Sequence, residues 1–185
     1  EMNEMNGRKL PSHYDNPLEV IFHNISEHVS PYFKKMNMTA NDITTIGNIV
    51  RIISLYFFYK KQFKLSAICY FIGVYFDDMD GYYARRYNMT SKFGDLYDHI
   101  SDIVINAIFI WLFLKLKFKF KKELSVLLIL LGILMSVHMG CQEKIYKKKS
   151  VLTLLQKLCP NEKHITYTRF FGYGTYMLII SLIIY

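Results

Sequence analysis

Long apolar runs, separated by short charged segments, dominate the pattern of this 185-residue chain. Five of these runs are predicted to form membrane-spanning helices, at residues 43–59, 63–76, 93–116, 124–139 and 169–185. A sixth run, 151–158, is too brief to cross a bilayer unaided. Because lipid accommodates only helices or closed barrels, and no two-residue alternation is present, we predict an all-α integral membrane bundle of about six transmembrane helices.

Residues 18–35 show a different pattern, in which apolar positions recur at spacings of three and four and polar residues fill the other face. This pattern predicts an amphipathic helix that lies in the membrane interface. Residues 1–17 are polar and are expected to form a loose N-terminal segment. We therefore divide the chain into that segment and a transmembrane domain over 18–185.

The charges cluster between the apolar runs, and Lys and Arg outnumber Asp and Glu by 23 to 15, a net charge of +8. Such clustering is typical of the loops of multi-span membrane proteins, so neither a disordered chain nor a nucleic-acid-binding module fits. The distribution of the basic residues favours a cytosolic N-terminus. The Lys-rich segments at 115–122 and 144–149 are expected to be solvated or close to anionic lipid headgroups.

Two further features limit the interpretation. The three cysteines are far apart and never form a C-x-x-C pair, so neither a disulfide framework nor a zinc site is predicted. The N-terminus shows no charged stretch followed by an apolar core, so insertion is expected to depend on the internal spans.

Arg51 falls inside the first apolar run and should face the bundle interior, because an ionisable side chain is costly in lipid.

Six of the 15 acidic residues lie between 77 and 102, at the end of the second apolar run and the start of the third: Asp77, Asp78, Asp80, Asp95, Asp98 and Asp102. Asp77 and Asp80 share one helix face, and Asp98 and Asp102 share another. Asp78 is rotated by ~100° from Asp77 on a helix and is expected to lie away from the shared face. A helical hairpin brings the two pairs together, where their mutual repulsion requires a positive charge. Carboxylates on facing helices, without a cluster of His or Cys, favour a hard cation such as Mg²⁺ or Mn²⁺.

Small residues and an arginine accompany the carboxylates. Gly81 and Ala84 follow Asp80, and Gly94 stands at the start of the facing helix, so a ligand can approach the backbone there. Arg85 is placed to meet a phosphate. Metals, small residues and Arg together describe a diphosphate site.

The segment Asp77-x-x-Asp80-Gly81-x-x-Ala84-Arg85, followed after eight residues by Gly94-x-x-x-Asp98-x-x-x-Asp102, resembles the signature of the CDP-alcohol phosphotransferase family. The segment from Thr39 to Thr44 also resembles the start of the family's first span, where Pro commonly stands in place of Ala40. The resemblance implies an integral membrane enzyme with its active site facing the cytosol. Such an enzyme transfers a substituted phosphate from a CDP-linked donor to an alcohol or lipid acceptor and releases CMP.

The resemblance also implies roles for individual residues. Two Mg²⁺ or Mn²⁺ ions would be held by four carboxylates: Asp77, Asp80, Asp98 and Asp102. Asp102 would also act as the catalytic base, together with His99. The CDP moiety would be surrounded by Asn41, Thr44, Gly81, Ala84, Arg85 and Gly94. Family members of this type often pair, so a homodimer is a further expectation, although nothing in the sequence marks its face.

The resemblance leaves the substrates open between two groups. The Ala84-Arg85-Arg86 segment and the adjacent Asp98 and His99 look most like the choline and ethanolamine phosphotransferases, which use CDP-choline or CDP-ethanolamine and diacylglycerol; we expect this reaction. The short chain and the segment 91–94 look more like the phosphatidylinositol or phosphatidylglycerophosphate synthases, which use CDP-diacylglycerol and a polar alcohol. That reaction is the alternative.

Two alternatives come from other classes. A magnesium-dependent membrane prenyltransferase also places paired Asp motifs on a helical bundle, but it lacks the Gly-x-x-Ala-Arg segment and the Gly94 position. A non-catalytic cation-binding membrane protein needs only the acids and leaves the small residues unexplained. Metal-dependent release of CMP separates the three classes.

Overall fold

The computed structural model describes residues 7–116, 120–146 and 151–185, and every regular element in these ranges is helical. The predicted all-α class is therefore confirmed. The middle of the predicted loop at 115–122, the Lys residues at 147–149 and residues 1–6 of the polar segment lie outside the described residues.

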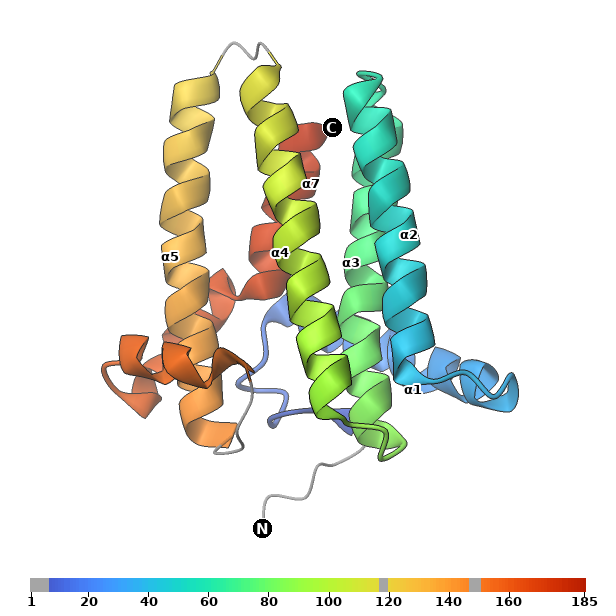
Figure 1. Cartoon of the computed structure of the whole chain (residues 1–185). Coiled ribbons are helices and arrows are strands. Elements are labelled where there is room, and N and C mark those ends of the chain that lie inside the picture. The colour runs from blue at the N-terminus through green and yellow to red at the C-terminus, as the bar shows by residue number, and fades with distance from the viewer. Residues whose placement is uncertain (1–6, 117–119, 147–150) are drawn as a thin grey trace.

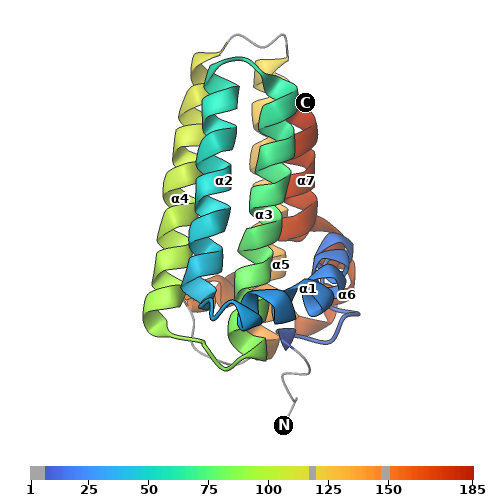
Figure 2. The same cartoon turned by 90° about the vertical axis from the view of Figure 1, so that its right-hand side faces the viewer.

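Four long helices stand side by side and form the bundle (Figures 1 and 2). They are α2 (Ala40–Tyr59), α3 (Phe63–Arg86), α4 (Lys92–Lys115) and α5 (Lys121–Tyr146). A shorter helix, α7 (Tyr173–Ile184), packs against α3 and α5. The core between these helices is aromatic and aliphatic and includes Phe58, Tyr70, Phe109 and Met177.

Three helical segments of the described chain are long and apolar enough to cross a membrane: Lys92–Lys115, Lys121–Tyr146 and Glu162–Ile184. The helices α2 and α3 run beside them but carry more polar residues, among them Arg51 and Asp77. The segment proposed as a sixth span is the 3₁₀ helix η2 (Val151–Leu158), which packs against α5. Eight residues at ~2 Å each are too short for a hydrocarbon core of ~30 Å. The count of six spans is therefore not confirmed.

The remaining elements gather at one end of the bundle (Figure 1). The helix α1 (Pro17–Lys35) lies across this end, and η2, η3 (Glu162–His164), α6 (Ile165–Thr168) and η4 (Arg169–Phe171) lie at the same end. The N-terminus of α2 is also here, where Thr39 and Asp42 form a capping box: the Asp42 carboxylate accepts the Thr39 N–H at 2.7 Å. Chain connections at this end place α1, the end of α3 and the start of α4 near one another.

The helix α1 is amphipathic, as predicted, but its faces are used differently from the expectation. Polar Glu19 and His23 are buried against the bundle, whereas Ile21 and Tyr32 are exposed by 53% and 67%. The reason is that the neighbouring end of α3 carries polar side chains such as Asp78, and buried His23 of α1 pairs with Asp78 there. The apolar residues that face outward suit a lipid interface.

The closest packing in the bundle is between α2 and α3. A Cβ atom added to Gly73 of α3 would lie 2.4 Å from Cγ of Arg51 and 3.3 Å from the carbonyl oxygen of Gly47. Small residues at such crossings let two membrane helices approach closely. Here the approach leaves just enough room for the Arg51 side chain to pass α3.

One prediction about the cysteines is wrong. Cys141 and Cys159 form a disulfide, with their Cα atoms 4.9 Å apart, and only Cys69 is free among the described cysteines. The bond ties the end of α5 to the segment that follows η2. The two cysteines are 18 positions apart, and η2 packs back on α5, a proximity that is not visible in the cysteine spacing.

Candidate active site

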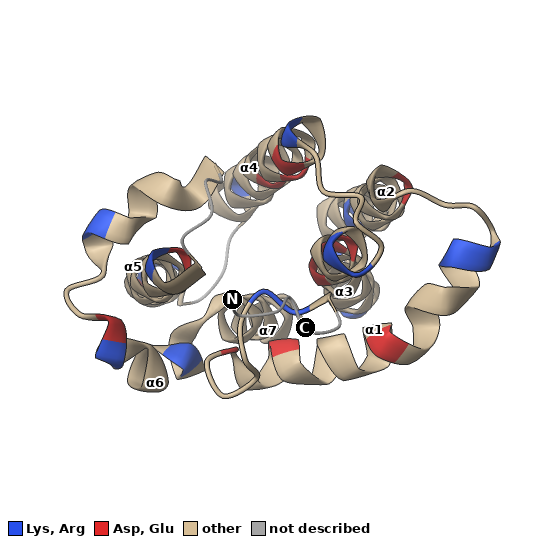
Figure 3. Cartoon of the chain, turned by 90° about the horizontal axis from the view of Figure 1, so that it is seen from below, with Lys and Arg blue, Asp and Glu red and all other residues tan. Residues whose placement is uncertain are grey.

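Three carboxylates converge between α3 and α4, near the end of the bundle that carries α1. One oxygen each of Asp77, Asp98 and Asp102 lies within 4.8 Å of the others. Figure 3 shows the acidic segments of α3 and α4 on neighbouring helices when the molecule is viewed from this end. The i,i+4 spacing on α4 and the position of Asp77 on α3 produce this trio, whereas the sequence predicted a set of four that includes Asp80. Asp80 is not a member of the trio and lies one helical turn further along α3.

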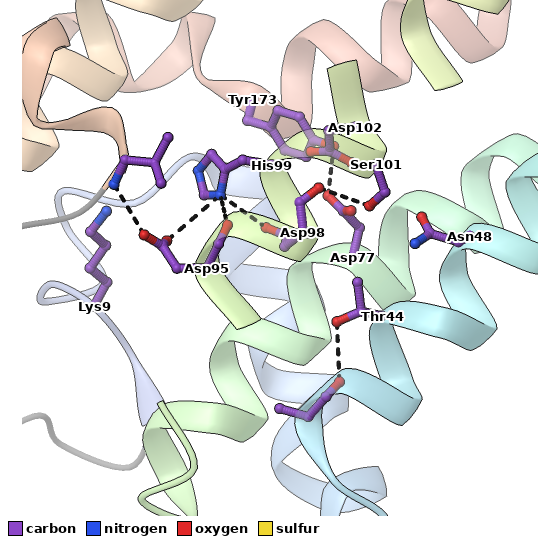
Figure 4. Close-up of polar contacts among 12 residues, drawn as sticks. Lys9, Thr44, Asn48, Asp77, Asp95, Asp98, His99, Ser101, Asp102 and Tyr173 are labelled. Atoms are coloured by element: carbon purple, nitrogen blue, oxygen red, sulfur yellow. Dashed lines mark hydrogen bonds and ion pairs between the residues drawn. The ribbon is translucent and has the colours of Figure 1, made fainter. Parts of the chain in front are cut away.

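Arg51 reaches this trio from α2. Its guanidinium pairs with Asp77 at 2.9 Å and directly contacts Asp102, and it also donates a hydrogen bond of 2.6 Å to the Asn48 side chain. Arg51 is 2% exposed, so the expectation that it faces the bundle interior is confirmed. Tyr173 of α7 donates a hydrogen bond of 2.7 Å to Asp77 (Figure 4). Sequence reasoning assigned neither Arg51 nor Tyr173 to the site, because they come from helices far from the signature.

The donor set fits a divalent cation. Oδ2 of Asp80 and Oδ1 of Asp98 are buried, and neither has a hydrogen-bond partner among the described residues. A buried carboxylate oxygen without a donor is costly, and a hard cation removes that cost. The four carboxylates supply oxygen ligands only, as Mg²⁺ or Mn²⁺ prefers.

A cavity of about 430 Å³ opens beside the carboxylates. Its wall contains all six residues predicted to surround the CDP moiety, together with Asp80, Asp98 and His99: Asn41, Thr44, Gly81, Ala84, Arg85 and Gly94. Asp77 and Asp102 do not line it but line a smaller adjoining cavity of about 190 Å³. The structure thus brings the predicted residues together around two adjoining spaces.

The small residues of the signature make room for polar side chains. A Cβ atom on Gly94 would lie 2.9 Å from Oδ1 of Asn41, and one on Gly81 would lie 3.1 Å from Nη1 of Arg85. The sequence suggested that these glycines let a ligand approach the backbone. In the structure they first allow Asn41 and Arg85 to lie against the helices at the cavity wall. Arg85 is further held by a hydrogen bond of 2.8 Å from its Nε to the carbonyl of Gly7.

His99 lies at the junction of the two cavities. Its Nδ1 lies 2.7 Å from the carbonyl oxygen of Asp95. The same nitrogen lies 3.6 Å from the carboxylate of Asp95 and 3.5 Å from that of Asp98 (Figure 4). Among the described contacts its polar neighbours are therefore Asp95 and Asp98 rather than Asp102.

Residues distant in sequence close the larger cavity. Lys9 of the N-terminal segment forms an ion pair with Glu143 of α5, and both line the cavity. The Val151 N–H at the start of η2 donates a hydrogen bond of 3.0 Å to the Asp95 carboxylate. These contacts join positions up to 134 residues apart, and no local sequence signal identifies them.

Asp78 also differs from the sequence expectation. It is not a member of the trio, but its Oδ2 lies 3.4 Å from Nε2 of His23 on α1, and Asp78 lines the smaller cavity together with the trio. The pKa of His23 is raised above its ordinary value. Burial by itself lowers this pKa, and the nearby carboxylates of Asp78 and Asp15 outweigh burial.

Comparison with known proteins tests the resemblance of the signature. The family model described as CDP-alcohol phosphatidyltransferase matches residues 37–184. The chain belongs to the CDP-alcohol phosphatidyltransferase family. This family is generally dependent on divalent metals, in agreement with the acidic cluster. Membership also removes the basis for the prenyltransferase alternative.

Three relatives of this CDP-alcohol phosphatidyltransferase chain are similar over part of their length. An archaetidylinositol phosphate synthase of Pyrococcus horikoshii is 30% identical over 81 residues, which cover 44% of this chain and 43% of the relative. An uncharacterized protein of Aquifex aeolicus is 28% identical over 101 residues, 55% of this chain and 47% of the relative. A CDP-diacylglycerol–glycerol-3-phosphate 3-phosphatidyltransferase of Rickettsia felis is 34% identical over 67 residues, 35% of this chain and 37% of the relative.

The chain thus matches these curated relatives over less than half of their own length. No solved structure matches it significantly. The names of the Pyrococcus and Rickettsia proteins fit the alternative expectation, CDP-diacylglycerol with a polar alcohol, better than the choline or ethanolamine reaction.

Proposed function

We propose that the chain catalyses the transfer of a phosphatidyl-type group from a CDP-linked lipid to a small polar alcohol, with release of CMP. The observation that supports this most directly is the position of the carboxylates. Asp77, Asp98 and Asp102 converge at the smaller cavity, and Asp80 and Asp98 line both cavities. Two adjoining spaces that share two carboxylates suit a donor and an acceptor that react between them.

In this proposal the larger cavity takes the CDP part of the donor. Its wall offers the Asn41 amide, the Thr44 hydroxyl and the Arg85 guanidinium, groups that pair with a base, a sugar and a phosphate. Thr44 is oriented by its own helix, because its hydroxyl donates to the Ala40 carbonyl at 3.2 Å.

The proposed reaction is a single displacement. The acceptor hydroxyl oxygen forms a bond to the phosphorus that carries the lipid, the bond from that phosphorus to the oxygen of CMP breaks, and CMP leaves with the electron pair. Asp102 receives the hydroxyl proton. Two divalent cations, when bound by Asp77, Asp80, Asp98 and Asp102, neutralise the charge of the diphosphate and of the leaving CMP.

Arg51 has a positioning role in this proposal. Its two contacts hold Asp77 and Asp102 in place on different helices, and its charge reduces their repulsion. Tyr173 restrains the second oxygen of Asp77. The carboxylates are thus oriented before any substrate binds.

We further propose that the end of the bundle carrying α1 faces the cytosol. The described part of the N-terminal segment, from residue 7, lies at this end, as do the end of α3 with Arg85 and Arg86 and the start of α4 with Lys92. The excess of basic residues in these short segments agrees with that orientation.

An assay of CMP release tests the function. The full chain, purified in detergent with Mg²⁺ or Mn²⁺, is given CDP-diacylglycerol, CDP-choline or CDP-ethanolamine, each with candidate acceptors. We expect CMP release from CDP-diacylglycerol, and its loss when EDTA is added. Release from CDP-choline or CDP-ethanolamine with diacylglycerol would replace the proposed donor. No release from any donor would favour a non-catalytic cation-binding protein.

A further inference from the structure

The smaller cavity, of about 190 Å³, has a second wall that the signature does not provide. One side is formed by Asp77, Asp98 and Asp102. The opposite side is formed by α1 and the segment before it, through Glu19, His23 and Asp15, all three of which are buried. A small molecule in this cavity therefore lies between the carboxylate trio and α1.

The α1 wall contains polar atoms that lack hydrogen bonds. Nδ1 of His23 lies 3.6 Å from Oδ2 of Asp15, and Nε2 of His23 lies 3.4 Å from Oδ2 of Asp78. Neither His23 Nδ1 nor the two carboxylate oxygens have a hydrogen-bond partner among the described residues. Buried polar atoms without partners are costly, and a ligand with hydroxyl groups would supply donors and acceptors to them.

The basic side chains of this wall are already engaged. Lys9 pairs with Glu143, and Arg85 donates to the Gly7 carbonyl. His23 lies between two carboxylates, Asp15 and Asp78. His99, which also lines the cavity, lies beside Asp95 and Asp98. Each basic side chain among the described lining residues therefore already has an acidic or backbone partner, and the proposed function assigns Arg85 to the donor phosphate.

Glu19 adds a further acidic group. The pKa of Glu19 is raised to about 7, by burial first and then by the charges of Asp78 and Asp15, against the opposite effects of the Gly174 N–H and His23. The same surroundings that make a negative charge on Glu19 costly also oppose an anionic ligand beside it. They accept a neutral hydroxyl or an amine.

We propose that the smaller cavity binds the acceptor, and that this acceptor is a small alcohol that carries neither a phosphate nor a carboxylate. The inference rests on the proposed function and specifies its acceptor. The hydroxyl groups of a polyol, or the hydroxyl and amine of an aminoalcohol, would bond to Glu19, His23 and Asp15 while the reacting hydroxyl faces Asp102. A phosphorylated alcohol would place its charge against this acidic wall.

Paired acceptors test the chemical class. The full chain with Mn²⁺ and CDP-diacylglycerol is supplied with glycerol or glycerol 3-phosphate, and with myo-inositol or its phosphate, two pairs in which the phosphate keeps a free hydroxyl. We expect the better unphosphorylated acceptor to exceed its phosphate by at least about 10-fold in kcat/KM, the size of an effect of one lost hydrogen bond to a charged group. A phosphorylated acceptor that is preferred would overturn the inference while the proposed function stands.

A binding measurement separates the two proposals when no acceptor is turned over. That result would count against the proposed function. Thermal stabilisation of the protein by millimolar myo-inositol or ethanolamine, and not by their phosphates, would still support the cavity assignment. Equal or greater stabilisation by the phosphates would contradict it.

Variants on α1 test the location. Glu19→Gln keeps an oxygen for the Gly174 N–H, which Glu19 accepts at 3.2 Å. We expect it to raise the KM of the acceptor by about 10-fold and to leave the KM of the donor unchanged. The matched control is Glu27→Gln, because Glu27 is the other carboxylate of α1 and lines neither cavity. An unchanged acceptor KM, or an equal rise in both KM values, would overturn the assignment.

A second pair of variants, at His23 and His28, tests the location if Glu19→Gln does not fold. His23→Gln removes the ring that lines the cavity, and His28→Gln is its control, since His28 is exposed and bonds only to the Asn24 carbonyl of its own helix in the described contacts. We expect only His23→Gln to raise the acceptor KM. Identical behaviour of the two variants would contradict the proposal.

Discussion

At the scale of single residues, the three carboxylates of the trio differ in how completely they are paired. Asp77 is held by Arg51 and Tyr173, Asp102 by Arg51, and Asp98 retains a buried oxygen with no hydrogen-bond partner in the described chain. An unpaired buried charge costs several kcal/mol, and Arg51 offsets this cost for Asp77 and Asp102. The negative charge of Asp98 is not offset in this way, which is the physical basis for the metal proposed there.

Replacing Asp98 or Asp102 by Asn should reduce CMP release by at least ~10²-fold, because each change removes a charge that the cations and the acceptor proton require. The rate of CMP release from the preferred donor is measured at saturating Mg²⁺. The control is Asp42→Asn, since Asp42 is outside both cavities and Asn keeps an oxygen for the cap of α2. Full activity in Asp98→Asn would contradict the metal assignment.

A variant of His99 distinguishes the two substrate groups. With a polar acceptor, Asp102 suffices as the base, and His99 only bonds to the Asp95 carbonyl, so His99→Ala should lower turnover by less than about 10-fold. If diacylglycerol is the acceptor and His99 takes part in its deprotonation, the loss should reach ~10²-fold. The comparison is kcat of His99→Ala and of the unaltered chain with the same donor. A loss of ~10²-fold with a polar acceptor would refute the role assigned here to Asp102 alone.

Adding one methyl group at Gly94 tests the nucleotide wall. In Gly94→Ala the new Cβ would lie 2.9 Å from Oδ1 of Asn41 and 3.1 Å from Oγ of Ser91, so the Asn41 side chain has to shift from its position at the cavity wall. We expect CMP or CDP to bind at least about 10-fold more weakly, as measured by equilibrium binding. Gly132→Ala is the control, because its Cβ would have ordinary contacts, with the nearest atom of Tyr176 at 3.8 Å. Unchanged affinity in Gly94→Ala would place the nucleotide elsewhere.

At the scale of elements, the attachment of α1 to α7 determines whether the smaller cavity has its second wall. Asn16 caps α1 by accepting the Leu18 N–H at 3.0 Å. Its amide also donates to the Arg169 carbonyl at 2.6 Å and to the Thr175 hydroxyl at 2.7 Å. One fully buried side chain therefore both starts the helix and attaches it to the rest of the protein.

Asn16→Ala should lower the free energy of unfolding by about 2–4 kcal/mol, the sum of a lost N-cap and of buried groups left without partners. Thermal unfolding of the purified protein in detergent measures this loss. Asn161→Ala is the matched control, because exposed Asn161 caps only the three-residue helix η3, and its loss should cost less than about 1 kcal/mol. Equal effects of the two variants would show that α1 does not depend on the attachment.

At the scale of the whole molecule, a bound cation should stabilise the fold, since the carboxylates come from two helices and are brought together only when the bundle is folded. Mn²⁺ at 100 times its dissociation constant adds about 2.7 kcal/mol, which raises the Tm of a chain of this size by about 5–10 °C. We expect this rise in the unaltered chain and in Asp42→Asn, its reversal by EDTA, and its absence in Asp98→Asn. A rise of the same size in Asp98→Asn would place the cation at another site, whatever the activity of that variant.

The sequence by itself determined the features that depend on local periodicity. Apolar runs predicted the helices, because backbone groups in lipid must bond within their own segment. The spacings from Asp77 to Asp80 and from Asp98 to Asp102 predicted which carboxylates share a face, because a helix repeats every 3.6 residues. The signature carried by these residues identified the family that the comparison confirmed.

Only the tertiary structure decided what surrounds these carboxylates. The contact of Arg51 with Asp77 and Asp102 needs the close approach of α2 and α3 at Gly73, and the bond from Tyr173 to Asp77 joins residues 96 positions apart. The burial of the polar face of α1 and the disulfide between Cys141 and Cys159 likewise depend on packing. A hydrophobic pattern distinguishes the apolar face of a helix from its polar face, but the polarity of the neighbouring helix determines which of the two faces is buried.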